Sequence, residues 1–208
     1  MKDLEVFQLI YQTMKIKDLL LDDNYKIFKQ NNQFKDKIII NDSMCKGLDN
    51  YKMWLSMGIT YKKVSHYNIL KDGTIYKHLE PDAVVNVLND EVLSNECIVI
   101  TLENHNAVTY KAGKYYDFFG NDITDNVHVV EKEWRGQFYW DNYSIEQYTS
   151  LKELIKDLKN KFLLSGELPD SNEFMNGFGK NYLASESNIT RNSISVNPLF
   201  NFNNLQFI

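Results

Sequence analysis

Two short apolar runs constrain the fold of this chain more than any other feature. Ile38-Ile39-Ile40, within the segment KDKIIIND at 35–42, is a β-branched run typical of a buried central strand. The segment ECIVITLEN at 96–104 predicts a second buried strand. Both runs indicate a sheet that lies inside the protein, with other elements packed against it.

The clearest helix is predicted in the segment YSIEQYTSLKELIKDLKNKF. Ser144 is a good N-cap, and Gln147 stands at the third helical position and completes a capping box. The apolar face predicted for this helix consists of Ile145, Tyr148, Leu151, Leu154, Ile155, Leu158 and Phe162.

The remaining segments complete a predicted α/β fold with a mixed central β-sheet flanked by helices. Residues 64–79 predict a hairpin that turns at Lys71-Asp72-Gly73, because Asp-Gly is a strong hairpin signal. Residues 50–58 predict a helix that ends at Gly58. Residues 105–143 predict a long loop rich in aromatic side chains, and the chain from 165 on predicts a polar, irregular tail.

The N-terminal segment predicts a helical appendage over residues 1–35, followed by the main domain at 36–208. The appendage either packs on the domain or docks on a partner. Its apolar residues recur at roughly helical spacing and predict one or two amphipathic helices over 4–22: Leu4, Phe7, Ile10, Tyr11, Met14, Ile16, Leu19 and Leu20.

Composition excludes several classes of function. The 208 residues include 12 Phe, 13 Tyr and 3 Trp, enough large side chains for a real core. The net charge of −5 and the absence of a basic run argue against nucleic-acid and membrane-surface binding. No window of about 18 apolar residues predicts a membrane span, and the start lacks the pattern of a signal peptide. Cys45 and Cys97 are expected to be buried, reduced thiols in a protein that folds in a cytosol.

The order of seven segments resembles a known enzyme family: IIIND, VSHYNILKDGTIY, CIVITLEN, WRGQFYW, YSIEQYTSLKELIKDL, SESNI and NPLFNF. It is similar to the zinc-dependent N-acetylmuramoyl-L-alanine amidases of type 2, which share a fold with a bacteriophage lysozyme and with peptidoglycan recognition proteins. The resemblance covers about residues 36–203 and implies an amidase-like domain. The stretch WRGQFYWDNYSIEQ looks closest to versions carried by bacterial viruses.

The resemblance implies a zinc site whose ligands are missing here. In the family, zinc on three protein ligands activates a water molecule. The matching positions carry Asn41, Glu186 and Ser195 in this chain. One carboxylate with an amide and a hydroxyl is a poor zinc site. The resemblance therefore implies that zinc, the family's cofactor, is lost, and no other cofactor is expected.

Three further positions are carried over from the family. Ser193 stands where the family has a basic residue, and Asn86 stands where it has a histidine that lines the substrate groove. His66 occupies a hairpin position at which the family often has a histidine that binds no metal. We interpret His66 as a structural histidine with satisfied hydrogen bonds.

A kept fold with a lost site implies a catalytically inactive amidase-like domain with a structural or binding role. The resemblance to viral versions implies a component of a bacteriophage virion or its assembly, located in the virion or the host bacterial cytoplasm. The expected partners are other virion or assembly proteins, with peptidoglycan as a further candidate ligand. Two alternatives remain open: an active amidase that hydrolyses the muramoyl–L-alanine bond, and a regulator that binds a polymerase or another cytosolic protein.

Other catalytic arrangements are weaker hypotheses. The sequence also offers carboxylate pairs that could cleave glycosides and a thiol–histidine pair that could act as nucleophile and base. The remaining histidines are interpreted as structural or exposed. The aromatic residues between 115 and 143 are either core or an interaction surface. The residues concerned are Glu103 with Asp117, Glu131 with Glu133, Cys45 with His66, and the histidines His78, His105 and His128.

Overall fold

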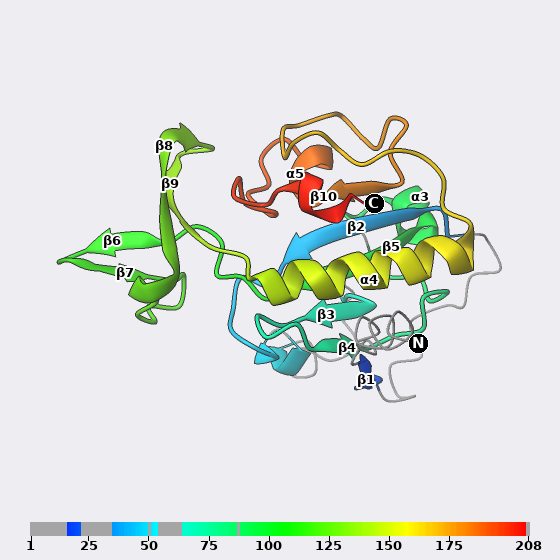
Figure 1. Cartoon of the computed structure of the whole chain (residues 1–208), viewed down its shortest axis with the longest axis horizontal. Coiled ribbons are helices and arrows are strands. Elements are labelled where there is room, and N and C mark those ends of the chain that lie inside the picture. The colour runs from blue at the N-terminus through cyan, green and yellow to red at the C-terminus, as the bar shows by residue number, and fades with distance from the viewer. Residues whose placement is uncertain (1–15, 22–34, 50, 54–63, 87, 207–208) are drawn as a thin grey trace, which may run out of the picture.

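The computed structural model describes residues 16–21, 35–49, 51–53, 64–86 and 88–206. A central sheet is covered on one side by the long helix α4, and two small hairpins project from one end of the molecule (Figure 1). The elements are β1 (Ile16–Asp18), β2 (Lys37–Asp42), β3 (Tyr67–Ile69), β4 (Ile75–Lys77), α3 (Glu91–Glu96), β5 (Cys97–Leu102), β6 (Thr109–Lys111), β7 (Lys114–Tyr116), η3 (Thr124–Asn126), β8 (Val127–Trp134), β9 (Gln137–Asp141), α4 (Ile145–Phe162), β10 (Leu183–Ser185), α5 (Glu186–Ile189) and η4 (Phe202–Leu205).

The predicted mixed sheet is confirmed. Its strand order is β1-β4-β3-β5-β2-β10, and all neighbours run parallel except β3 and β4. The two apolar runs are the adjacent parallel strands β2 and β5. Ile38 and Ile40 pack in the core on the α4 side, whereas Ile39 packs in a second core on the opposite face. Burial on both faces explains why these strands show no polar alternation.

The hairpin and the capped helix are also as predicted. Ser144 accepts a hydrogen bond from the N–H of Gln147, and the Gln147 side chain accepts from the N–H of Ser144. Gly73 in the β3–β4 turn has φ +80°, and an added Cβ would lie 2.9 Å from the carbonyl oxygen of Glu146. The turn therefore packs on the first turn of α4. The predicted apolar face is wrong at Ile145, which is 80% exposed, because Gln147 turns inward in its place.

Two other predictions are corrected. Residues 16–18 form the edge strand β1 and not a helix, because their backbone pairs with β4; residues 4–15 lie outside the described part. The segment 105–143 is not a loop but two hairpins, β6–β7 and β8–β9. Positive φ at Ala112-Gly113 and at Arg135-Gly136 matches the two-residue turns that favour hairpins. The Xaa-Gly pairs were the signal that could have revealed them.

The tail from residue 165 on is more regular than predicted. Within the predicted irregular tail, β10 joins the sheet beside β2 and leads directly into α5. Of the helix predicted at 50–58, residues 51–53 are helical, and the other residues lie outside the described part of the chain. In the described part of the chain, no helix is long and apolar enough to cross a membrane.

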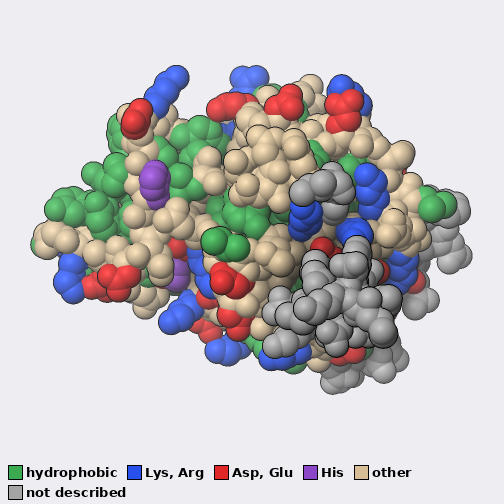
Figure 2. Space-filling view, viewed as in Figure 1, with side chains coloured by type: hydrophobic (Ala, Val, Ile, Leu, Met, Phe, Trp, Pro, Cys, Tyr) green, Lys and Arg blue, Asp and Glu red, His purple; other side chains and the backbone are tan. Residues whose placement is uncertain are grey.

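The two projecting hairpins, residues 109–141, form what we call the arm. Its aromatic side chains divide between the two predicted roles. Trp140 is fully buried and meets Trp134 edge to face, with ring centroids 5.4 Å apart. Phe118 and Phe119 are 77% and 60% exposed. Figure 2 shows hydrophobic side chains gathered on this end of the molecule.

Candidate functional site

The carboxyl ends of β2 and β10 bring together most of the positions carried over from the amidase family. Ser185 lies beside Ile40 in the parallel register, so Glu186 and Asn41 leave the sheet at the same edge. Ser195 reaches this edge from the C-terminal segment, where its hydroxyl accepts a hydrogen bond from the N–H of Asp42 at 2.7 Å. The Ser193 hydroxyl donates to the carboxylate of Glu186 at 3.3 Å.

Asn86 and His66 lie elsewhere. The Asn86 side chain bonds to the backbone and side chain of Asn89 in a turn. His66 is fully buried, where its Nδ1 accepts from the N–H of Val99 at 2.9 Å and its Nε2 lies 3.0 Å from the Ala83 carbonyl oxygen. Burial, with Lys35 nearby, lowers the pKa of His66 to about 3. This geometry agrees with a structural histidine that links β3 to β5.

The side chains at the sheet edge do not fit a zinc ion. The Asn41 amide oxygen accepts from the Thr101 hydroxyl, and the Ser195 oxygen already serves the Asp42 N–H. Glu186 is the one carboxylate of the set, and zinc favours imidazole and thiolate. Among the described residues, no group of three His, Cys, Asp or Glu side chains could hold a metal ion.

A buried polar network beneath this edge was missed in the sequence. It joins the end of β2 to the base of the arm and to the C-terminal segment. Tyr143 donates to the carboxylate of Asp42 at 2.9 Å, and the Asn106 amide donates to the same carboxylate at 2.8 Å. The Asn197 amide donates to the Asn104 side chain and to the carbonyl of Asp141. The only signal in the sequence was the unusual density of Asn and Asp around 104–106, 141–142 and 197.

Asp42 is the titratable centre of this network. Burial raises the pKa of its carboxyl to about 8, against the opposing hydrogen bond from Tyr143 and the charge of Lys71. Burial therefore favours the neutral form of this side chain more than in an exposed aspartate. A carboxyl group held in this way is a structural element and not a free base.

This burial predicts a pH dependence of stability that Asp42→Asn removes. The folded pKa lies above the unfolded value, so the stabilisation by the neutral carboxyl is complete below about pH 4 and is lost as the pH rises towards 8. The slope is at most about 1.4 kcal/mol per pH unit. We expect the stability of the wild type to fall relative to Asp42→Asn between pH 4 and 8 in urea unfolding. A difference that stays constant with pH would contradict the assignment.

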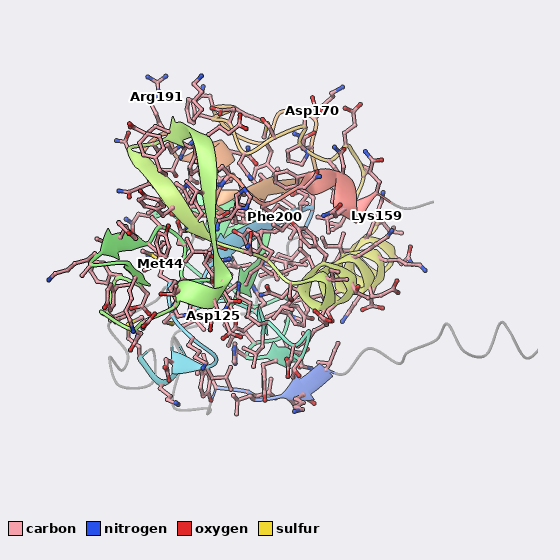
Figure 3. All side chains as sticks on the ribbon, turned by 60° about the vertical axis from the view of Figure 1, so that its left-hand side comes forward. Met44, Asp125, Lys159, Asp170, Arg191 and Phe200 are labelled. Atoms are coloured by element: carbon pink, nitrogen blue, oxygen red, sulfur yellow. The ribbon has the colours of Figure 1, made fainter. Side chains whose placement is uncertain are left out.

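The turn of β8–β9 fastens the arm to the segment that carries the family positions. Arg135 donates to the carbonyls of Ser187 at 3.0 Å and Thr190 at 3.3 Å, and also to that of Ser193. Its guanidinium lies 4.5 Å from the ring centroid of Trp134. These carbonyls lie between Glu186 and Ser195 in the chain. In Figure 3, Arg191 marks the upper end of the β8–β9 hairpin and Asp125 its lower end.

The alternative catalytic arrangements gain no support from the geometry. Glu103 accepts from the N–H groups of Gly47 and Lys71 with its two oxygens, so it acts as a backbone clamp. The Cys45 thiol donates to the carbonyl of Ser43, and both ring nitrogens of His66 contact backbone groups. Both cysteines are buried, as expected. Glu131 and Glu133 are exposed on β8.

Of the other histidines, His78 is buried and stacks on Tyr51, with ring centroids 4.6 Å apart. Burial lowers the pKa of His78 to about 4. His128 is exposed on β8. His105 lies 2.9 Å from Asp117 through its Nδ1, and it lines a cleft.

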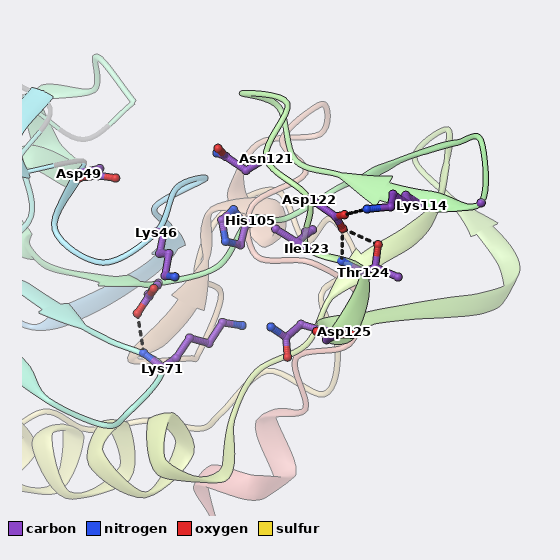
Figure 4. A pocket seen from close by; sticks show the side chains of 13 residues that line it. Lys46, Asp49, Lys71, His105, Lys114, Asn121, Asp122, Ile123, Thr124 and Asp125 are labelled. Atoms are coloured by element: carbon purple, nitrogen blue, oxygen red, sulfur yellow. Dashed lines mark hydrogen bonds and ion pairs between the residues drawn. The ribbon is translucent and has the colours of Figure 1, made fainter.

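That cleft lies between the arm and the loops after β2, β3 and β5 and has a volume of about 1050 Å³ (Figure 4). Its body wall carries Lys46, Lys71 and His105, and its arm wall carries Lys114 and the segment 121–126.

Comparisons with known proteins identify the fold. No family model and no curated protein matches the sequence. AmpD, solved as a selenomethionine derivative, is 10% identical with a TM-score of 0.53, and the match covers 92% of each chain. The complex of tracheal cytotoxin with the ectodomains of peptidoglycan recognition proteins LCa and LCx matches at 9% identity and a TM-score of 0.50, covering 88% of this chain and 92% of the other. The N-acetylmuramoyl-L-alanine amidase LysC from Clostridium intestinale matches at 16% identity and a TM-score of 0.48, covering 91% and 94%. The similarity to AmpD and to the recognition-protein complex shows that the chain has the fold of the type 2 amidases and peptidoglycan recognition proteins, as the sequence order predicted.

Proposed function

We propose that this chain is a catalytically inactive member of the amidase fold that acts as a structural or binding component, in a bacteriophage virion or its assembly. One observation carries the proposal: Asn41, Glu186 and Ser195, which the resemblance assigns to the family's ligand positions, are each hydrogen-bonded within the protein. Neutral amide and hydroxyl oxygens neither bind zinc well nor activate water, so this edge of the sheet is suited to structure and not to hydrolysis.

The arm supports a binding role. It presents exposed aromatic side chains, and such residues are enriched at the centres of protein interfaces. The viral setting rests on the likeness of WRGQFYWDNYSIEQ to versions carried by bacterial viruses. We expect the chain to be found by mass spectrometry in purified virus particles or in their assembly intermediates. Its exclusion from both would contradict the viral part of the proposal.

The principal test is zinc content and hydrolysis. The pure chain is expected to retain far less than one zinc per molecule after dialysis and to release no muropeptide from peptidoglycan. About one zinc per chain together with muropeptide release would establish the alternative, an active N-acetylmuramoyl-L-alanine amidase, and would end the proposal.

The reverse experiment restores the ligand types. The triple variant Asn41→His, Glu186→His, Ser195→Asp is expected to bind zinc with a Kd of about 1 µM or tighter, because imidazole and carboxylate then meet at one sheet edge. The matched control is Asn86→His, which adds a histidine away from that edge and is expected to add no zinc affinity. If the triple variant folds with native circular dichroism and still binds no zinc, the placement of these positions as ligand sites is wrong.

A further inference from the structure

The cleft beneath the arm has a charge arrangement that the proposed structural role does not use. Its charged side chains fall into two groups: those that are neutralised by a protein partner and those that are not. Asp122 pairs with Lys114 at 2.5 Å, Asp49 pairs with Lys52 at 2.7 Å, and Glu103 is held by two backbone N–H groups. These carboxylates therefore attract a cationic ligand less strongly than an unpaired carboxylate would.

Lys71 is also paired within the protein. Its ammonium lies 3.0 Å from the fully buried carboxylate of Asp141 and donates to the carbonyl of Asn142. The lysine thus ties the β3–β4 turn to the base of the arm. It forms a fixed part of the cleft wall, with its charge balanced by Asp141.

Two opposite charges remain without a side-chain partner among the described residues. Lys46 on the body wall and Asp125 on the arm wall both line the cleft, and neither takes part in an ion pair or a side-chain hydrogen bond there. Figure 4 shows them on opposite sides of the cleft. Both side chains are exposed, so neither pays a large desolvation cost in the free protein.

His105 adds an oriented group to the body wall. The residue is 8% exposed, and its Nδ1 lies 2.9 Å from Asp117. Although burial opposes it, hydrogen bonds from Asn121 and from the N–H of Phe119 hold the pKa of Asp117 below its ordinary value, so this carboxylate stays charged. A charged carboxylate thus lies beside the His105 ring at the body wall of the cleft.

We propose that this cleft binds a small zwitterionic ligand of the amino-acid or short-peptide class. The ligand's carboxylate meets Lys46 on the body wall, and its ammonium meets Asp125 on the arm wall. A ligand with a single charge would pair with either Lys46 or Asp125 and would leave the other residue without a partner. The inference goes beyond the proposed structural role, since a scaffold needs no ligand at this place, and it involves none of the residues at the sheet edge.

The experiment uses the full chain, labelled with ¹⁵N, in low-salt buffer because salt screens exposed charges. Three probes are titrated: the dipeptide L-alanyl-L-alanine, its N-acetyl derivative without the ammonium, and its C-terminal amide without the carboxylate. We expect saturable shifts of the 121–126 amides with the dipeptide, at a Kd of about 1 mM or tighter. Each blocked probe is expected to bind roughly tenfold more weakly.

Two isosteric variants assign the walls. Asp125→Asn is expected to weaken binding of the dipeptide roughly tenfold, so that the dipeptide and its N-acetyl derivative bind equally well. Lys46→Gln is expected to weaken binding of the dipeptide by a similar factor, so that the dipeptide and its C-terminal amide bind equally well. The matched controls, Asp170→Asn and Lys132→Gln, lie on the exposed surface outside the cleft and should leave the titration unchanged.

Three outcomes overturn the inference. They are the lack of a saturable shift with the dipeptide at about 10 mM, ten times the expected Kd, equal binding of all three probes by the wild type, and dipeptide binding that is unchanged in both cleft variants. Binding of a neutral tetrasaccharide in place of the dipeptide would also overturn it. Zinc content and muropeptide release report on the sheet edge alone, so failure of this inference is distinguishable from failure of the proposed function.

Discussion

Replacing Asp141 with alanine is expected to lower the free energy of unfolding by about 3 kcal/mol. The Asp141 side chain is fully buried, accepts from the N–H of His105 at 2.8 Å, and lies 3.0 Å from the ammonium of Lys71. Its removal leaves Lys71 beside a vacated pocket and leaves the His105 N–H without its acceptor. The effect falls at the low end for a buried pair because the Lys71 side chain is 28% exposed and can regain water.

The measurement is chemical unfolding of the wild type and the variant at pH 7. Asp122→Ala is the matched control: it also removes an aspartate paired with a lysine, but both partners are largely exposed. We expect that control to cost less than about a third of the stability lost in Asp141→Ala, because an exposed ion pair contributes little and the hydrogen bonds of Asp122 with Thr124 also lie at the surface. If the two variants lose the same stability, the buried pair at the base of the arm does not have the structural role assigned to it.

Replacing Arg135 with alanine is expected to cost about 2 kcal/mol and to loosen the arm. The guanidinium donates to three backbone carbonyls of the segment 187–193, and hydrogen bonds from a charged donor contribute about 1.5–3 kcal/mol each before screening and side-chain entropy are subtracted. Arg135→Lys keeps the charge but lacks the planar fork, so we expect it to recover less than half of the loss.

The readouts for Arg135 are the unfolding midpoint and the rate of proteolysis within β8–β9. The matched control is Arg191→Ala. Arg191 is also stacked on an aromatic ring, with 5.0 Å between the guanidinium and the centroid of Phe174, but it is exposed. Its loss should cost at most about 0.5–1 kcal/mol and leave cleavage of the arm unchanged. Unchanged proteolysis in Arg135→Ala would show that this turn does not hold the arm.

The contacts of Asp141 and Arg135 both fasten the arm to the rest of the fold. A catalytic zinc would cross-link strand β2, the segment after β10 and the C-terminal segment. Here the same three regions are joined by Ser195 on the N–H of Asp42, by Ser193 on Glu186 and by the forked contacts of Arg135. These hydrogen bonds connect the three regions to one another.

The sequence alone determined the central sheet, the β3–β4 hairpin and helix α4. Each of these depends on local information: continuous apolar runs for strands that are buried on both faces, an Asp-Gly turn, and a capping box before an amphipathic helix. The order of these elements also pointed to the fold of the type 2 amidases and peptidoglycan recognition proteins.

Only the tertiary structure decided the rest, because those features depend on contacts between residues far apart in the chain. β1 became a strand because the edge of β4 offered hydrogen bonds, which outweighed its helical spacing. The Asp42 network, the Arg135 contacts and the cleft each join segments separated by dozens of residues. A side chain's burial and charge state depend on which distant groups surround it, and no local pattern in the sequence encodes that arrangement.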